Sequence, residues 1–586
     1  MAMTKMTATG PQRPFAPMRD AVALCRRHLL AAAGFSALVN ILYIVPTLYM
    51  LQVYDRVVPT QGVQTLAFLT LVLVFALACL SLLDRIRSRL LTRAGVVLNA
   101  ALAPAVLDAT IGRPDLPVAR SAVRELDALR AVLGGPAMLA LFDAPWMPIY
   151  VGVCFLVHPL IGLMALVGGL LLAGIAWRNE RATRTGMDHA QEVAGQTYAA
   201  QDAVLAAADS VRALGMRRAL VARQLRKREA MLARQTESGF HAGSYFTATK
   251  FVRLALQSLA LGLGAWLAVH NMISGGAIFA SSFLIARALA PIELLIGSWK
   301  TLAQARGGYR DLDRLLATAI DRPEPTRLPA PRGALMVEGV TVLNAARDAM
   351  VLNGVSFAVA PGEVVAIVGP SGSGKSTLMR AIVGAMPADR GAVRIDAAEL
   401  GDWDPERLAR HIGYLPQDSV LFEGTVKENI ARFEGELDAG LEAIDAAAVA
   451  AAELVGARDL ILRLPDGFDH RLALGGRGVS AGQAQRIALA RAVYGDPALY
   501  VLDEPNAHLD AEGDAALNAA ITRLKAAGKT ILVVSHKLGV LPVVDKMLVL
   551  RDGRVELFGP RDEVLAKIAP PNVRRMVPAA QGGTAA

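Results

Sequence analysis

The sequence predicts two domains of different class: an α-helical transmembrane domain with six spans, followed by an α/β domain that contains a P-loop. Hydrophobic residues make up 54% of the 586 residues, a higher share than water-soluble proteins usually have. Long uncharged segments lie only in the first half of the chain. In the second half, short stretches rich in Val and Ile alternate with helical ones, which is typical of an α/β domain.

Six apolar segments are long enough to cross a bilayer core of about 30 Å. The first two carry no charge, and the stretch 131–177 is interrupted only by Asp143 and His158. His158-Pro159 predicts a turn between two spans, and His270-Asn271 predicts another. The predicted spans are residues 29–54, 57–83, two within 131–177, about 252–271 and about 275–298.

The distribution of basic residues predicts the orientation of these spans. Arginines cluster beside the long connections, 85–130 and 178–250, whereas the short turns carry little basic charge beyond Arg56. The positive-inside rule therefore places both termini and both long connections in the cytoplasm. The same rule accounts for the net charge of +9. The sequence does not interleave aromatic and basic residues, so this charge does not indicate a nucleic-acid-binding protein.

Changes in composition predict the domain boundaries. The long connections have a helical pattern with few breakers, so we expect membrane helices that continue into the cytoplasm as rods. Four prolines in DRPEPTRLPAPRG predict an extended connector. The predicted parts are a short cytoplasmic segment (1–28), the six-helix domain (29–316), a Pro-rich linker (317–333), the nucleotide-binding domain (334–569) and a disordered tail (570–586).

The stretch GEVVAIVGPSGSGKSTLMRAIVG fits the P-loop pattern between a strand and a helix. Its glycines allow backbone N–H groups to surround phosphate, and the helix N-terminus adds a positive dipole end. We expect Lys375 to reach the β and γ phosphates of ATP and Ser376 to bind Mg²⁺. The predicted nucleotide-binding residues here are Gly369, Pro370, Ser371, Gly372, Ser373, Gly374, Lys375, Ser376 and Thr377.

A second apolar strand, in ALYVLDEP, ends in two acidic residues. Asp503 would hold Mg²⁺ through water or together with Ser376. Glu504 would act as the general base that polarises the attacking water. A core strand that happens to end in carboxylates is the alternative, and the P-loop upstream argues against it.

The order of the motifs resembles that of ABC ATPases. VSAGQAQRIALARA (479–492) resembles their signature, and it lies between the P-loop and the Asp-Glu pair. The resemblance identifies Gln417 with the Q-loop, Asp510 with the D-loop and His536 with the switch histidine. Members of this family form head-to-tail dimers of their nucleotide domains. The resemblance therefore implies that Ser480, Gly482 and Gln483 contact nucleotide in the partner subunit. It also implies that Asp510 belongs to the nucleotide site, that Gln417 contributes to the metal site, and that Gln417 and His536 act with Glu504 in catalysis.

Two departures from the family pattern affect the nucleotide site. Ala481 stands where a glycine is expected, and its methyl group would be strained only if the backbone φ angle there is positive. Residues 342–345 contain no aromatic side chain that could stack on adenine, which leaves nucleotide selectivity open.

The whole chain resembles ABC exporters in which six spans precede one ATPase domain. The stretches 49–66, 142–162 and 280–300 resemble type I secretion ABC transporters of the PrtD-like group, which export proteases and RTX proteins. This resemblance implies an inner-membrane homodimer, a periplasmic membrane-fusion adaptor, an outer-membrane tunnel protein and unfolded substrates with a C-terminal secretion signal. The alternatives are a lipid, peptide or drug exporter and a membrane-anchored regulatory ATPase or channel. About 28 residues before the first span are too few for a peptidase domain.

Two charged residues fall in the last predicted span. At about 1.5 Å per residue, Arg287 lies near the middle of the bilayer, and Glu293 lies nearer the cytoplasm. A charge at this depth is costly and is expected to face a partner or an aqueous interior. We therefore expect that the two residues either line the path of the polypeptide or form a structural ion pair with another helix.

Overall fold

The computed structural model describes residues 18–112, 116–320, 327–344, 346–437, 440–473, 475–535 and 542–568. His536, part of the predicted linker and the predicted tail lie outside the described residues. The chain divides into two compact units, residues 1–321 and 322–586.

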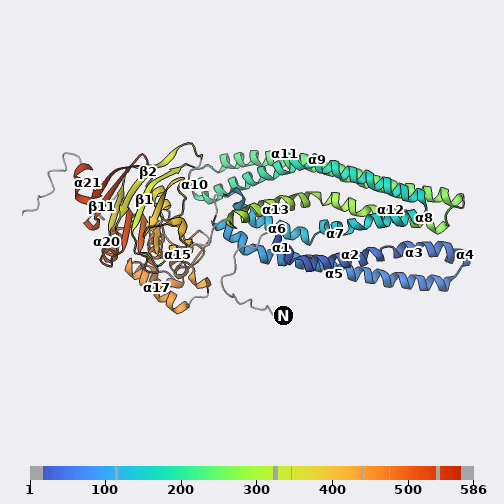
Figure 1. Cartoon of the computed structure of the whole chain (residues 1–586), viewed down its shortest axis with the longest axis horizontal. Coiled ribbons are helices and arrows are strands. Elements are labelled where there is room, and N and C mark those ends of the chain that lie inside the picture. Colours follow the sequence, from blue (N-terminus) through green and yellow to red (C-terminus); the bar gives the residue numbers. More distant parts are fainter. Residues whose placement is uncertain are drawn as a thin grey trace, which may run out of the picture. The chain divides into compact units, whose positions relative to one another are not determined.

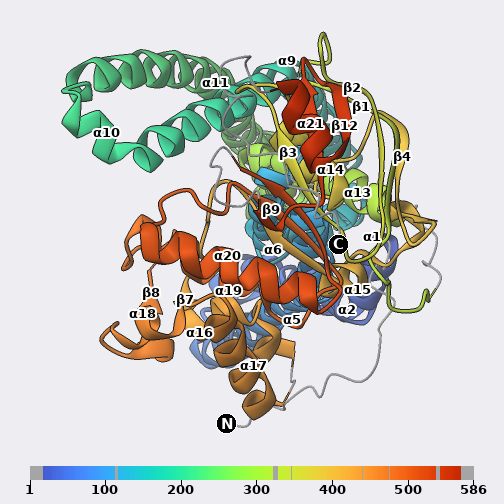
Figure 2. The same cartoon turned by 90° about the vertical axis from the view of Figure 1, so that its left-hand side faces the viewer.

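The first unit is helical, and six of its described helical stretches are long and apolar enough to cross a membrane, as predicted. Helices α5, α9 and α11 are 50, 48 and 53 residues long, so they extend well beyond the thickness of a bilayer. Helices α9 and α11 lie side by side, and α10 joins them (Figures 1 and 2). The main helices are α1 (Met18–Leu24), α2 (Arg26–Leu42), α3 (Val45–Gln52), α4 (Val58–Thr60), α5 (Val63–Gly112), α6 (Ala122–Leu133), α7 (Pro136–Asp143), α8 (Met147–Val157), α9 (Pro159–Ala206), α10 (Ala208–Ala213), α11 (Arg217–Val269), α12 (Gly275–Gly297) and α13 (Trp299–Ile320).

The first turn between spans lies further along the chain than the charges suggested. The helical segment continues past Asp55 through a π-helical stretch, Val53–Val57, and the chain turns at Gln61, whose φ angle is 51°. The helix tolerates Asp55 because this carboxylate accepts hydrogen bonds from the Gly276 N–H (2.6 Å) and from the Ser274 hydroxyl at the start of α12. Asp55, whose charge predicted the end of the first span, therefore caps the N-terminus of α12.

The predicted turn at His158 lies between α8 and α9. Its extended backbone, with φ −164°, breaks the helix, and its Nδ1 accepts a hydrogen bond from the Leu160 N–H (3.2 Å). Helix α12 is more enclosed by protein than the other candidate spans, with small residues such as Ala280 and Ala288 buried against its neighbours. Helix α1 also packs into this unit, through the buried residues Met18 and Ala21.

The second unit contains two main sheets (Figure 2). The larger has the strand order β12-β11-β3-β10-β9-β6, and β12 alone runs antiparallel to its neighbour. The smaller is antiparallel with the order β2-β1-β4-β5. The strands of the two sheets are β1 (Leu335–Leu343), β2 (Met350–Val359), β3 (Val364–Val368), β4 (Arg390–Ile395), β5 (Ala398–Glu399), β6 (Ile412–Leu415), β9 (Leu499–Asp503), β10 (Thr530–Val534), β11 (Lys546–Arg551) and β12 (Arg554–Pro560).

Helices and one small ribbon complete this unit. Every residue of β9 and β10 is buried, because helices cover the parallel sheet. The remaining elements are α14 (Lys375–Ile382), α15 (Pro405–Arg410), β7 (Gly424–Thr425), α16 (Val426–Ile430), α17 (Leu441–Leu454), α18 (Arg458–Leu462), β8 (Arg471–Leu472), α19 (Ala481–Val493), α20 (Ala511–Ala526) and α21 (Arg561–Ile568).

The parallel strands bring the sequence motifs to one edge of the larger sheet. Strands β3, β9, β10 and β6 are parallel to one another, so their carboxyl ends face the same way. The P-loop follows β3, Asp503 ends β9, Gln417 follows β6 and Ser535 follows β10. This edge is where open α/β sheets bind their ligands.

Candidate functional site

The P-loop has a backbone shape that requires glycine at several positions. Gly372 and Gly374 have φ angles of 79° and 98°, which side chains with a Cβ rarely adopt. A Cβ at Gly374 would lie 2.9 Å from the Val351 carbonyl oxygen, and one at Gly369 would collide with the Leu550 carbonyl oxygen. Helix α14 begins directly after this loop, so its N-terminal N–H groups are directed toward the loop.

Lys375 lies within the loop and not in solvent. Only 7% of the residue is exposed, and its ammonium group donates hydrogen bonds to the carbonyl oxygens of Gly369 and Pro370, each at 2.9 Å. Both acceptors are neutral carbonyls, so neither contact compensates the positive charge of Lys375. A phosphate group in the loop would supply that charge.

Three oxygen-bearing side chains fit a magnesium site. The Ser376 hydroxyl donates to the Gln417 amide oxygen at 3.3 Å, and the Asp503 side chain is near them at the end of β9. Asp503 is 1% exposed, and its Oδ1 has no hydrogen-bond partner among the described residues. Burial raises the pKa of this carboxyl, whereas the Ser376 hydroxyl acts to lower it. A buried carboxylate oxygen without a partner, next to a hydroxyl and an amide oxygen, suits a hard cation such as Mg²⁺.

Glu504 has an unusual backbone conformation. Its φ angle of 51° is in the left-handed region, which is uncommon for a residue with a side chain. Its N–H donates to the Val534 carbonyl of β10 (3.1 Å), and its carbonyl accepts from the Ala507 N–H (3.0 Å). The chain therefore turns sharply at Glu504, directly after β9 ends at Asp503.

The signature segment forms the beginning of α19. The Ser480 hydroxyl accepts from the Gln483 N–H (3.3 Å), and the Gln483 side chain accepts from the Ser480 N–H (2.8 Å), which makes a capping box. Ala481 is the first helical residue, is exposed and does not have a positive φ angle. A Cβ at Gly482, by contrast, would lie 2.9 Å from the His508 carbonyl oxygen. The backbone therefore accepts alanine at 481 and requires glycine at 482.

Asp510 makes its contacts within its own subunit in this structure. It caps α20 by accepting from the Gly513 N–H (2.8 Å), and it pairs with Arg486 of α19 at 2.6 Å. These contacts, the Gly513 hydrogen bond first, lower the pKa of the Asp510 carboxyl. Arg486 was not among the predicted site residues, although a charged residue six positions after Ser480 in the signature segment was a usable signal.

The end of β10 is linked to the segment that follows Glu504. The Asn506 side chain donates to the Ser535 hydroxyl at 3.2 Å, and both residues are buried. His536 follows Ser535 directly and lies outside the described residues, so its predicted role stays a prediction.

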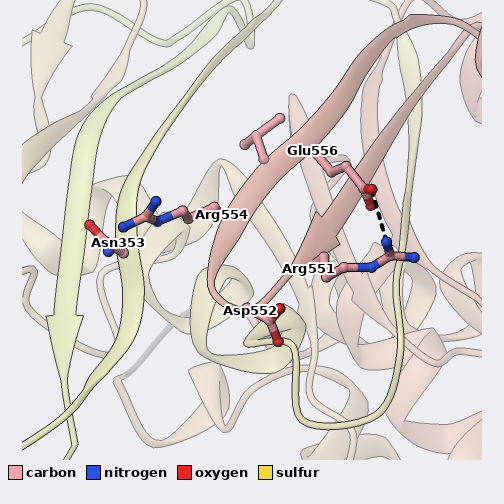
Figure 3. A pocket seen from close by; sticks show the side chains of 6 residues that line it. Asn353, Arg551, Asp552, Arg554 and Glu556 are labelled. Carbon is pink, nitrogen blue, oxygen red and sulfur yellow. Dashed lines mark hydrogen bonds and ion pairs between the residues drawn. The ribbon is translucent and has the colours of Figure 1, made fainter.

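A concavity next to the P-loop is lined by the β11–β12 hairpin and by β2 (Figure 3). The Gly553 N–H of that hairpin donates to the Ser373 carbonyl at 3.2 Å, which fixes the hairpin against the P-loop. Arg551 pairs with Glu556 at 2.9 Å, and Arg554 faces the Asn353 amide (Figure 3). The lining contains no aromatic ring, so it does not replace the adenine-stacking side chain that residues 342–345 lack.

The two charged residues of α12 have different partners in the helical unit. Glu293 forms an ion pair with Arg253 of α11, in line with the structural alternative for that residue. The Arg287 guanidinium carbon lies 3.3 Å from the centre of the Tyr43 ring, and its Nη2 is 3.5 Å from the Asn40 Oδ1. Arg287 thus contacts an aromatic face and an amide.

A buried ion pair joins three helices near Arg287, and no role was predicted for its carboxylate, Asp143. Asp143 of α7 accepts hydrogen bonds from Arg87 (2.6 Å), Ser36 (2.8 Å) and Asn40 (2.7 Å). Arg87 is 3% exposed and also pairs with Asp84 at 2.6 Å. Because both charges are buried and have several partners, this cluster fixes α2, α5 and α7 to one another.

Comparisons with known proteins agree with this architecture. The ABC transporter family matches residues 352–507. The chain is 41% identical over 562 residues to the type I secretion system ATP-binding protein PrsD of Rhizobium meliloti, covering 95% of each chain. It is 30% identical to the cyclolysin secretion/processing ATP-binding protein CyaB of Bordetella pertussis, covering 92% of this chain and 76% of CyaB. A bacterial Atm1-family ABC exporter with ATP bound, at 24% identity, has the same fold, with a TM-score of 0.79 over 95% of this chain and all of that one.

Proposed function

The chain belongs to the type I secretion ATP-binding proteins of the ABC transporter family, and from this premise we propose how it exports polypeptides. It is a multi-pass membrane ATPase that drives the export of protein substrates. The observation that carries this function is the 41% identity to PrsD, because it extends over both the membrane unit and the ATPase unit. It favours protein export over the lipid, peptide or drug alternative.

In the proposed reaction, the P-loop N–H groups and Lys375 bind the β and γ phosphates of ATP. Ser376, Gln417 and Asp503 would hold Mg²⁺, whose charge would offset that of the phosphates. The support for this metal site is the buried Asp503 oxygen described above. Glu504 orients the attacking water and accepts its proton.

We propose that two copies of the chain share each ATP. Ser480, Gly482 and Gln483 of one subunit would then contact the γ-phosphate held by the P-loop of the other. The exposed Ser480 and Ala481 at the start of α19 support this arrangement, because a helix N-terminus attracts an anion such as the phosphate held by a second subunit. Asp510 and His536 would complete the shared site.

Membership of the family supports a proposal about the cellular setting. We propose an inner-membrane homodimer with cytoplasmic ATPase domains, a periplasmic membrane-fusion adaptor and an outer-membrane tunnel protein. The substrate would be an unfolded protein with a C-terminal secretion signal. The basic residues beside the long connections support the cytoplasmic placement.

Substrate-stimulated ATP hydrolysis tests this function. The purified chain in lipid nanodiscs is given a C-terminal peptide of an RTX-type protein, a scrambled peptide of the same composition, or a panel of lipids and hydrophobic drugs. We expect the C-terminal peptide alone to change the ATPase rate. Stimulation by lipids or drugs but not by the peptide would contradict the proposal, and ATPase activity without any vectorial transport in proteoliposomes would favour a regulatory ATPase.

A further inference from the structure

One buried amide connects three segments of the ATPase unit that the catalytic motifs define. Gln485 lies on α19, five residues after Ser480, and is 1% exposed. Its Oε1 accepts a hydrogen bond from the Ser419 hydroxyl. Its Nε2 lies 3.4 Å from the Glu504 carbonyl oxygen and 3.3 Å from that of Pro505.

These contacts place Gln485 between the candidate metal site, the candidate general base and the signature. Ser419 is two residues beyond Gln417, which belongs to the candidate metal site. Glu504 is the candidate general base, and α19 begins with the signature. A buried amide with partners on all of these segments conveys a displacement of one segment to the others, since losing any of its hydrogen bonds is costly.

The contact between Gln485 and Glu504 is important because of the backbone conformation of Glu504. A left-handed residue that is not glycine persists only where its surroundings hold it in place. The Glu504 N–H donates to the Val534 carbonyl, and the Glu504 carbonyl accepts from the Ala507 N–H and contacts Gln485 of the signature helix. A shift of this carbonyl would rotate the peptide and move the Glu504 carboxylate relative to the attacking water.

We propose that Gln485 is a positioning residue for hydrolysis, coupling the Q-loop and the signature helix to Glu504 through the Glu504 backbone. It acts on the chemical step and leaves the affinity for nucleotide unchanged, because it contacts none of the predicted phosphate-binding side chains. The inference rests on the proposed role of Glu504 as general base.

The test compares variants of the full-length chain in nanodiscs. Gln485→Met keeps the size of the side chain and removes all its hydrogen bonds. Ser419→Ala removes only the link to the Q-loop segment. The control is Thr530→Val, which removes a fully buried hydroxyl that accepts from the Gly362 N–H at 3.0 Å, at the opposite end of the sheet strands. For each variant we measure kcat and KM for ATP, binding of ATP in the absence of hydrolysis, and the midpoint of thermal unfolding.

We expect Gln485→Met to lower kcat by about tenfold or more while KM and ATP affinity stay within about twofold of wild type. Ser419→Ala should lower kcat by about threefold, and the double variant should be no slower than Gln485→Met because both act on one path. Thr530→Val should lower the unfolding midpoint and leave kcat unchanged.

A purely structural role predicts a different result. If Gln485→Met lowers the unfolding midpoint as Thr530→Val does and retains wild-type kcat, or if it raises KM at unchanged kcat, the inference is wrong. If Gln485→Met does not fold, Ser419→Ala decides: an unchanged kcat overturns the inference, and a lower kcat at constant KM supports it. A Glu504→Gln variant that still hydrolyses ATP would instead refute the proposed role of Glu504.

Discussion

Gly482 and Ala481 provide a matched pair that tests how the signature is built. Adding a methyl group at 482 places a Cβ 2.9 Å from the His508 carbonyl oxygen, closer than real Cβ contacts allow. Either α19 or the segment around His508 must therefore move. Removing the methyl group at 481 changes an exposed first-turn position that already has no positive φ angle.

The size of the effect follows from the cost of overpacking, which is about 1–3 kcal/mol. If this free energy adds to the activation barrier for hydrolysis at the shared ATP site, Gly482→Ala should lower kcat by about 5- to 150-fold. Ala481→Gly should leave kcat within about twofold of wild type, since glycine at this exposed position relieves no strain and loses no contact.

Steady-state ATP hydrolysis by the purified chain measures both variants, and thermal unfolding shows whether each is folded. The reasoning would be refuted if Ala481→Gly accelerated hydrolysis many-fold, because position 481 would then be strained. It would also be refuted if Gly482→Ala folded and hydrolysed ATP at the wild-type rate, because the close approach to His508 would then have no consequence.

Two further predictions concern buried charges. Burial raises the pKa of the Asp503 carboxyl above its usual 3.8, so the folded state binds the proton more tightly than the unfolded state and loses stability as pH rises through that range. Asp503→Asn should therefore raise the thermal unfolding midpoint of the nucleotide-free protein at pH 7, and the difference from wild type should shrink toward pH 4. An equal or lower midpoint at pH 7 would contradict this prediction. Arg87→Met removes one partner of the buried Arg87–Asp143 pair and should destabilise the helical unit by about 3 kcal/mol in chemical unfolding. The double variant Arg87→Met with Asp143→Leu should recover much of that loss, because it also removes the unpaired carboxylate. A double variant that is no more stable than Arg87→Met would show that the unpaired Asp143 charge is not the cause of the loss.

Features that depend on local sequence could be predicted. Six apolar stretches of sufficient length predicted six spans, and the spacing of glycines around Lys375 predicted the P-loop between a strand and a helix. The parallel order of β3, β9, β10 and β6 then brings Asp503 and Gln417 to the same edge as the P-loop.

Contacts between distant segments could not be predicted in this way. Asp55 looked like the end of a span because its partner at Gly276 is 221 residues away along the chain. Nothing local to Gln485 or Asp143 identifies which of several distant groups each one contacts. Their partners are set by how distant segments pack against one another, which residue spacing along the chain does not encode.

The proposed function requires that ATP hydrolysis at Glu504 drives export. The most direct measurement follows ATP hydrolysis and the release of a polypeptide with a C-terminal secretion signal, in cells that contain the adaptor and the tunnel protein, for the wild type and for Glu504→Gln. We predict that Glu504→Gln binds ATP, accumulates as an ATP-bound dimer, hydrolyses almost none and exports no polypeptide. Export by Glu504→Gln at the wild-type rate would contradict the claim that hydrolysis at this site drives secretion.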